Sequence, residues 1–270
     1  METIKESLIK KKVQELYAMN NVWYIDDSKI YSCYHQELLE FEKMSYPKNG
    51  NLLLEIGAGR GRILMSFAKR YRMIIAVDIS EKMLSDLKNK CAREKVNNVY
   101  LVRGDAENLP FKDNIFELVL APEVIGHCPN PNKLVLEMIR MIGIRDGIGI
   151  LSTAANYLSL PGLVGQAKSS YNCFLKPKNL KVLFSAIKSY LASSRKFWLY
   201  QQGYCRDSFF SIRKILRNLE LKIEKVSGAG ILPAYLSMRA DAIEKLSIFF
   251  PFKFFSRVII VSFKNKESYD

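Results

Sequence analysis

The sequence predicts an α/β protein in which a mostly parallel sheet carries helices on both faces. Three observations support this fold class. Residues 51–56 form a short apolar run that leads into a glycine-rich turn, similar runs then alternate with helical stretches up to residue 152, and three of these runs end at a carboxylate. Repeated strand–helix units with apolar strands are typical of a doubly wound sheet that is buried on both sides.

The predicted elements follow one another in a regular order. Helices at 3–20 and 29–44 precede a chain break at 47–50. We then expect strands at 51–56, 73–77, 99–102, 115–120 and 147–152, and helices at 60–70, 80–95 (capped by Ser80) and 131–141. An irregular stretch at 155–200 is followed by a helix at 206–219, a strand at 220–227, a helix at 238–248 and a strand at 256–263.

Length and composition limit the kinds of protein this sequence can encode. The 270 residues are 49% hydrophobic, which is enough for one large domain or one domain with a cap. The chain has no apolar run of about 18 residues, so we expect no transmembrane helix. Residues 1–12 are rich in lysine and contain no apolar segment, so we expect no secretory signal there. Five scattered cysteines without a C-x-x-C motif indicate reduced thiols in a cytoplasmic protein rather than a disulfide framework or a zinc site.

The net charge of +14 is unevenly distributed along the chain. Residues 1–150 contain 22 Lys and Arg and 20 Asp and Glu, whereas residues 151–270 contain 19 and 7. The basic C-terminal part indicates an anionic partner, such as nucleic acid, anionic lipid or a phosphorylated acceptor. The alternative is a solvated lysine-rich surface without a partner, because the charges are dispersed. The aromatic segment 248–257 allows two readings in the same way, as a peripheral membrane contact or as internal packing.

A glycine-rich turn is the most informative motif. Gly57, Gly59 and Gly61 alternate directly after the first strand, and Glu55 lies two residues before them. A strand, a tight glycine turn and a helix form the unit that binds nucleotide-like cofactors, because glycine permits φ > 0 and a close approach of the backbone to the ligand. The G-x-G-x-G spacing differs from the G-x-G-x-x-G of NAD sites, and this disfavours an NAD-dependent enzyme.

Three carboxylates, Glu55, Asp78 and Asp105, end three successive predicted strands. The carboxyl ends of parallel strands meet at one crevice, and buried acids there require a ligand rich in donors. Asp78 lies 21 residues after Gly57 in the sequence. At this sequence separation an acid can reach the ribose hydroxyls of an adenosine cofactor. Asp105 is placed to accept from an adenine amino group and Glu55 to face a cationic amine. The set suits an adenosine that carries a positive charge.

Five motifs occur in the order and spacing of a known family. They are EIGAGRG at 55–61, AVDIS at 76–80 with Met83, GDAENLPF at 104–111, FELVL at 116–120 and EVIGH at 123–127. Residues 50–155 thereby resemble class I S-adenosylmethionine-dependent methyltransferases. The subgroup includes ubiquinone/menaquinone-biosynthesis-type and many small-molecule and lipid methyltransferases. Glu117, where the family often has Asp, and Gly126, where a larger residue is usual, depart mildly from the pattern.

The resemblance implies a fold and a set of binding residues. The fold is a Rossmann-like sheet of seven strands, with the last strand antiparallel and inserted beside the sixth. The methionine part of S-adenosylmethionine would lie over the glycines. Its ribose hydroxyls would bind Asp78, and its adenine would pack near Met83. Asp105 and Ala106 would meet the adenine edge, and Ile79 and Ala121 would flank the cofactor.

Four parts of the chain follow from this interpretation. Residues 1–50 form an N-terminal helical cap, 51–154 the S-adenosylmethionine-binding core, 155–205 an insertion that caps the substrate, and 206–270 the remainder of the methyltransferase fold. The two caps would select the acceptor.

Catalytic candidates are few because the chain has only two histidines. His127 follows the fourth strand, where an imidazole could take a proton from the acceptor, and Glu123 is a similar candidate. His127 could instead have a structural role in its loop. His35, on the second helix, is a candidate to line the acceptor pocket or to lie on an exposed face. Methyl transfer can also proceed by alignment and desolvation without a base.

We therefore expect a methyltransferase that acts on a small-molecule or lipid-linked acceptor, which could be anionic. An RNA-modifying methyltransferase is an alternative that the basic C-terminal part favours, although no RNA-binding module is evident. A non-catalytic binding or scaffolding protein on the same fold is a third, which the intact acids disfavour. No metal site is expected. The acceptor, the methylated atom and the oligomeric state do not follow from the sequence.

Overall fold

A computed structural model describes residues 2–18, 32–45, 49–143, 147–153, 209–229, 256 and 258–264. Seven strands form one sheet in the order β3-β2-β1-β4-β5-β7-β6. The strands are β1 (Gly50–Ile56), β2 (Tyr71–Asp78), β3 (Val99–Arg103), β4 (Leu118–Ala121), β5 (Ile148–Thr153), β6 (Lys222–Ala229) and β7 (Val258–Lys264). The first five are parallel, and β7 runs antiparallel between β5 and β6, so the predicted position and direction of the last strand are confirmed.

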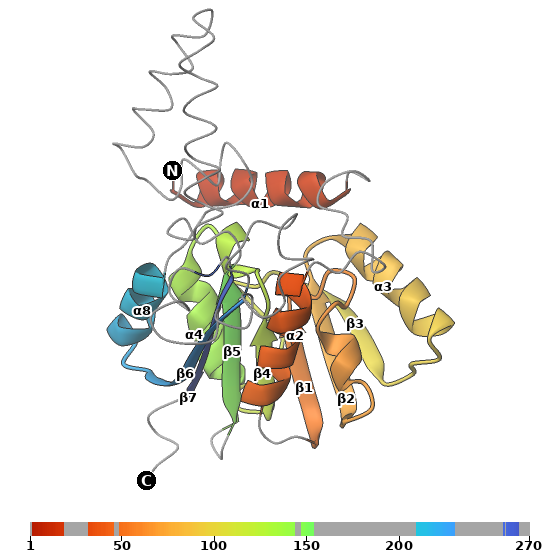
Figure 1. The fold of residues 1–270 in the computed structure, drawn as a ribbon. Helices are drawn as coiled ribbons and strands as arrows, with labels where there is room; N and C mark the ends of the chain where they lie inside the picture. Colours follow the sequence, from red (N-terminus) through yellow and green to blue (C-terminus); the bar gives the residue numbers. More distant parts are fainter. Residues whose placement is uncertain are drawn as a thin grey trace, which may run out of the picture.

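Helices cover both faces of the sheet (Figure 1). They are α1 (Glu2–Ala18), α2 (Ser32–Met44), α3 (Glu81–Arg93), α4 (Pro131–Met141) and α8 (Phe209–Asn218), together with the short 3-10 helices η2 (Leu64–Phe67) and η3 (Ile125–His127). Successive strand residues point to opposite faces, so each strand contributes to two cores. One core includes α4 and α8, and the other includes α2, α3 and η2.

α1 does not pack on either face of the sheet. It lies across the edge at which the parallel strands end, as Figure 1 shows. It contacts α3, and its polar side chains reach α4 and the loops that follow β3 and β4. Because a parallel sheet gathers its ligand-binding loops at this edge, α1 covers the candidate site.

One predicted helix is wrong. The segment 60–70 contains only the single 3-10 turn η2 between other turns. Most of its backbone bonds span three residues, as from Ser66 N to Ile63 O, and a single four-residue bond runs from Met65 N to Gly61 O. The Ser66 hydroxyl also donates to the Ile63 carbonyl. Gly61, which has a positive φ, lies at the start of the segment and a side chain competes for the segment's carbonyls, so i→i+4 bonding does not propagate.

The other predicted elements that fall on described residues agree to within a few residues. Ser80 caps α3 as predicted, because its side chain accepts a hydrogen bond from Met83 N. The irregular stretch 155–200, the helix at 238–248 and the aromatic segment 248–257, apart from Ser256, lie outside the described residues. Where the structure describes the chain, it contains no helix that is long and apolar enough to cross a membrane.

Candidate functional site

The three alternating glycines all adopt positive φ, at 68° for Gly57, 52° for Gly59 and 73° for Gly61. A Cβ at Gly57 would lie 2.6 Å from a Val124 methyl carbon, and a Cβ at Gly61 would lie 2.5 Å from a Leu87 methyl carbon. At Gly59 a Cβ would meet nothing within 4 Å. The outer two glycines are therefore required by packing, whereas the middle one faces open space in which a ligand can approach the backbone.

Asp78 fastens this turn to the end of β2. Its two carboxylate oxygens accept hydrogen bonds from Gly59 N and Ser80 N, each at 2.8 Å. Burial raises the pKa of Asp78, although the backbone N–H groups that face it act in the opposite direction. The carboxylate thus stands at the rim of the turn, held by main-chain donors.

Glu55, near the end of β1, is a deeply buried acid. It is 1% exposed, and its Oε2 atom has no hydrogen-bond partner. Burial raises its pKa to about 8, against the opposing effects of Arg62 and of the Leu64 backbone. An orphaned carboxylate oxygen beside an open glycine turn fits a ligand that brings a cation or a donor.

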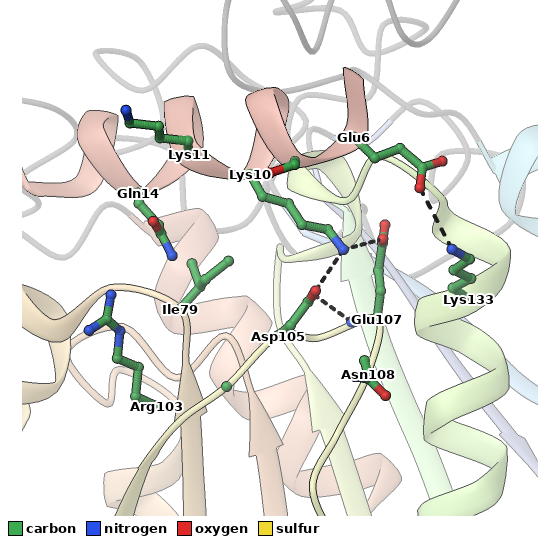
Figure 2. Close-up of a pocket in the computed structure, with 12 residues that line it drawn as sticks. Glu6, Lys10, Lys11, Gln14, Ile79, Arg103, Asp105, Glu107, Asn108 and Lys133 are labelled. Atoms are coloured by element: carbon green, nitrogen blue, oxygen red, sulfur yellow. Dashed lines mark hydrogen bonds and ion pairs between the residues drawn. The ribbon is translucent and has the colours of Figure 1, made fainter. Parts of the chain in front are cut away.

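A pocket of about 1010 Å³ lies between α1 and the loops that follow β2 and β3 (Figure 2). Its floor contains Ile79, Arg103 and Asp105, and α1 contributes Lys10 and Gln14. The Lys10 ammonium lies 2.6 Å from Asp105 Oδ2 and 2.8 Å from Glu107 Oε2. Burial alone would lower the pKa of Lys10, but its two carboxylate partners raise it overall, so Lys10 is held charged.

A second contact of α1 lies over the loop that follows β4. The Tyr17 hydroxyl is 2.7 Å from His127 Nε2, and the two rings meet edge to face. His127 ends the 3-10 turn η3, whose Gly126 is buried. This turn places the imidazole under α1, so a residue from the N-terminal cap and the catalytic candidate of the core meet directly.

Four residues beside the glycine turn are joined in a ring by hydrogen bonds and ion pairs, one of them through the backbone N–H of Glu123. We call this set the Glu123 ring: Glu37, Arg62, Glu123 and Ser152. Glu123 N donates to Ser152 Oγ (3.0 Å), which donates to Glu37 Oε1 (2.6 Å). Glu37 Oε2 lies 2.7 Å from Arg62 Nη1, and Arg62 Nη2 lies 3.7 Å from Glu123 Oε2. Burial lowers the pKa of Arg62, but Glu37 and Glu123 outweigh it and raise the pKa overall. The guanidinium also stacks on the Tyr34 ring.

The structure brings some of the predicted site residues together and sets others apart. Glu55, the glycines and Asp78 are adjacent, and Ile79 and Asp105 share the pocket. Ala121 is fully buried and Ala106 packs against the core, so neither lines that pocket. Met83 is half-buried in the first turn of α3, and His35 is exposed on α2. Glu117, one departure from the family pattern, binds Asn51 at the far end of β1.

The sequence reasoning missed Lys10, Tyr17, Glu37 and Arg62. Three of these come from α1 or α2, and their proximity depends on how the helices pack. Arg62 directly follows the last glycine of the turn, and this position is the one signal that could have revealed it. Among the described residues, no group of three or more His, Cys, Asp or Glu could hold a metal ion.

The fold and the residues of the site together define the class of protein. The open position at Gly59, the orphaned oxygen of Glu55 and the acids that end β2 and β3 fit a cofactor with an amine, a ribose and an adenine. The seventh strand between the fifth and the sixth is the arrangement that the resemblance implied. The class is therefore that of Rossmann-like methyltransferases.

Comparison with known proteins agrees with this class. Residues 54–147 match the family model of the methyltransferase domain. Norajmaline N-methyltransferase from Rauvolfia serpentina is 36% identical over 170 residues, which is 57% of this chain and 51% of that protein. The ubiquinone/menaquinone biosynthesis C-methyltransferase of Rickettsia prowazekii is 29% identical over 106 residues, which is 37% of this chain and 43% of that protein.

A solved structure has a similar fold. Magnesium protoporphyrin IX methyltransferase from Synechocystis PCC 6803, with bound S-adenosylhomocysteine, superposes with a TM-score of 0.59 at 15% identity, covering 98% of this chain and 100% of that one. Residues 54–147 thus match a methyltransferase domain, and the fold is that of class I methyltransferase structures, as the resemblance predicted. The chain spans about half the length of the curated relatives that it matches.

Proposed function

We propose that the protein is an enzyme that transfers a methyl group from S-adenosylmethionine to a small-molecule or lipid-linked acceptor. One observation carries the proposal. A glycine turn that is open at Gly59 and tied to Asp78 adjoins a fully buried carboxylate, Glu55, with an orphaned oxygen. A fold that had lost its ligand would gain by replacing this acid with an apolar residue, because an unpaired buried polar group is costly.

The placement of the residues supports the following binding roles. Gly57, Gly59 and Gly61 would lie beneath the methionine part of the cofactor, and Glu55 would receive its ammonium group. Asp78 would hold the ribose hydroxyls, and Asp105 would hold the adenine amino group after Lys10 withdraws. When bound, S-adenosylmethionine supplies an electrophilic methyl group on a sulfonium centre.

The chain's own contribution to the chemistry is positioning and proton transfer. Tyr17 holds the His127 imidazole through a 2.7 Å contact at the other end of α1. An imidazole in this position is suited to take the proton that leaves the acceptor as it becomes methylated. α1 covers both parts of the site and would keep water from the reacting groups.

The first test is calorimetric titration of the purified protein with S-adenosylmethionine and S-adenosylhomocysteine. Micromolar binding would support the proposal, and the complex would then be screened for transfer of a labelled methyl group to small-molecule, lipid-linked and RNA acceptors. Absence of binding by correctly folded protein would overturn it. A cytoplasmic location is part of the proposal, and the buried Cys91 and Cys128, which form no disulfide, support it.

A further inference from the structure

Two arginines form ion pairs with α2, and they lie at opposite ends of the sheet. Arg62 pairs with Glu37 at 2.7 Å and Arg70 pairs with Glu42 at 3.4 Å, and each guanidinium also lies over an aromatic ring. Arg70 directly precedes β2, whereas Arg62 directly follows Gly61 of the glycine turn. Because a doubly wound sheet binds its ligands where the parallel strands end, Arg62 is the arginine that a ligand can meet.

The ion pair of Arg62 leaves hydrogen-bonding capacity unused. Arg62 Nη1 and Glu37 Oε2 lie 2.7 Å apart, yet both atoms are buried without a hydrogen-bond partner, so the two groups are not aligned for a hydrogen bond. Arg62 Nη2 lies 3.7 Å from Glu123 Oε2, which is beyond hydrogen-bond distance. A guanidinium has five N–H donors in a planar fork that matches a carboxylate. A bound carboxylate would therefore complete it.

Glu55 is a second incomplete group close to Arg62. Burial raises the pKa of Glu55, and Arg62 is the strongest of the influences that oppose this rise, so the two side chains interact electrostatically. Glu55 Oε2 is also buried without a hydrogen-bond partner. An acid and a guanidinium, each with an unsatisfied buried atom, thus occur together beside the glycine turn. An α-amino acid group carries the complementary pair, an ammonium and a carboxylate on one carbon.

A ligand group with both charges suits this place better than a single ion. Burial lowers the pKa of Arg62, but the nearby carboxylates raise it overall, so the guanidinium stays charged. Glu55, with a pKa of about 8, is mostly protonated at neutral pH and can ionise when an ammonium group arrives. A zwitterion brings no net charge into a buried region, and each of its charges meets a partner there.

We propose that Arg62 binds the carboxylate of the cofactor's methionine part, and that Glu55 and Arg62 together form a receptor for its α-amino acid group. The inference rests on the proposed methyltransferase function. Glu37, which is fully buried and accepts a hydrogen bond from Ser152 Oγ at 2.6 Å, holds the guanidinium beside the glycine turn. A ligand with the adenosine part alone would leave both Glu55 and Arg62 unsatisfied, so the site should select against it.

The first part of the test compares ligands on the unaltered chain and measures binding rather than turnover. The protein is titrated calorimetrically with S-adenosylhomocysteine, with its decarboxylated analogue, with its deaminated analogue, and with methylthioadenosine, which lacks both charged groups. We expect loss of the carboxylate to weaken binding about tenfold, a difference of about 1.4 kcal/mol, and methylthioadenosine to bind most weakly. Equal affinity for S-adenosylhomocysteine and its decarboxylated analogue would overturn the role of Arg62.

The second part assigns the preference for the carboxylate to one residue. Arg62→Gln should reduce it to below about twofold, whereas Arg70→Gln, which removes the other arginine paired with α2, should leave it unchanged. Glu55→Gln should retain the preference for the carboxylate and lose the preference for the amine. Thermal unfolding shows which variants are folded. Arg62→Lys serves if Arg62→Gln does not fold, because it keeps a cation beside Glu37 without the planar fork and should lower the preference to about threefold.

The two proposals fail in different ways. If S-adenosylhomocysteine does not bind, the methyltransferase function fails, and this inference fails with it. If S-adenosylhomocysteine binds but the Arg62 variant keeps the full preference for the carboxylate, or Arg70→Gln loses it equally, only the amino acid receptor is overturned.

Discussion

Glu55 and Asp78 end adjacent strands of the same sheet, yet the protein treats them in opposite ways. Asp78 is held by two backbone N–H groups, and one of its donors belongs to the glycine turn itself. Glu55 is buried with an orphaned oxygen and a pKa of about 8. The first acid is held by main-chain donors, whereas one oxygen of the second lacks a hydrogen-bond partner. Asp78 therefore fixes the shape of the site, whereas Glu55 is the acid whose protonation should respond to a bound ligand.

Removing the first acid should have the largest effect. Asp78→Ala leaves Gly59 N and Ser80 N without their acceptor and removes the partner of the ribose. Two hydrogen bonds to a charged group correspond to about 3 kcal/mol, so we expect affinity for S-adenosylmethionine to fall about 100-fold in calorimetry. Asp113→Ala, which removes an exposed acid paired with Arg140, is the control and should not change the affinity. Unchanged binding by Asp78→Ala would show that the turn does not form the site.

Neutralising the second acid should have a smaller effect. Glu55→Gln keeps the shape of the side chain but cannot become an anion, so we expect S-adenosylmethionine to bind about tenfold more weakly. Because the cofactor's cation favours ionised Glu55, binding at pH 7 should release about one proton from the wild type and none from the variant. Calorimetry in buffers of different ionisation enthalpy measures this release. Equal proton release by both proteins would show that Glu55 does not respond to the ligand.

The raised pKa of Glu55 also predicts a pH dependence of stability without any ligand. Between the ordinary pKa of 4.5 and about 8, the folded state binds more protons at Glu55 than the unfolded state. The contribution of Glu55 to the free energy of unfolding therefore falls as pH rises through this window, by at most about 1.4 kcal/mol per pH unit. Chemical denaturation of wild type and Glu55→Gln across pH 5–9 measures the difference. The variant should become relatively more stable with rising pH, and parallel curves would contradict the burial argument.

The smallest expected effect on ligand binding concerns a third acid, Asp105, which is already paired with Lys10. Lys10→Met removes the cation that bridges Asp105 and Glu107, and it loosens α1 without altering the glycine turn. Association and dissociation of S-adenosylmethionine, followed by stopped-flow fluorescence, should both accelerate. Because the change affects access, we expect the affinity itself to move by less than about threefold. Glu15→Gln, at an exposed position on the same helix and outside the pocket, is the control. Unchanged rates in Lys10→Met would show that this contact does not control access.

The sequence predicted those parts of the site that depend on residues close together in the chain. The glycine spacing, the acids at the strand ends and the Ser80 cap depend on a few consecutive positions, and the structure shows them as turns, strand ends and a cap. Tyr17 lies 110 residues from its partner His127, and Glu37 lies 115 residues from Ser152. Such pairs are set by helix packing, which no local pattern records. The segment 60–70 failed for a related reason, because helical periodicity there was overridden by turn geometry.

α1 makes its two site contacts from one side of a single helix. Lys10 and Tyr17 are seven residues apart, which is two helical turns or about 10 Å. One lies at the end where the adenine would bind and the other beside His127, where the acceptor would enter. On the proposed function, the exchange of spent cofactor and the admission of a new acceptor would both require the same helix to move. In steady-state turnover the two events would share one rate, and a substitution at either end of α1 would be felt at the other.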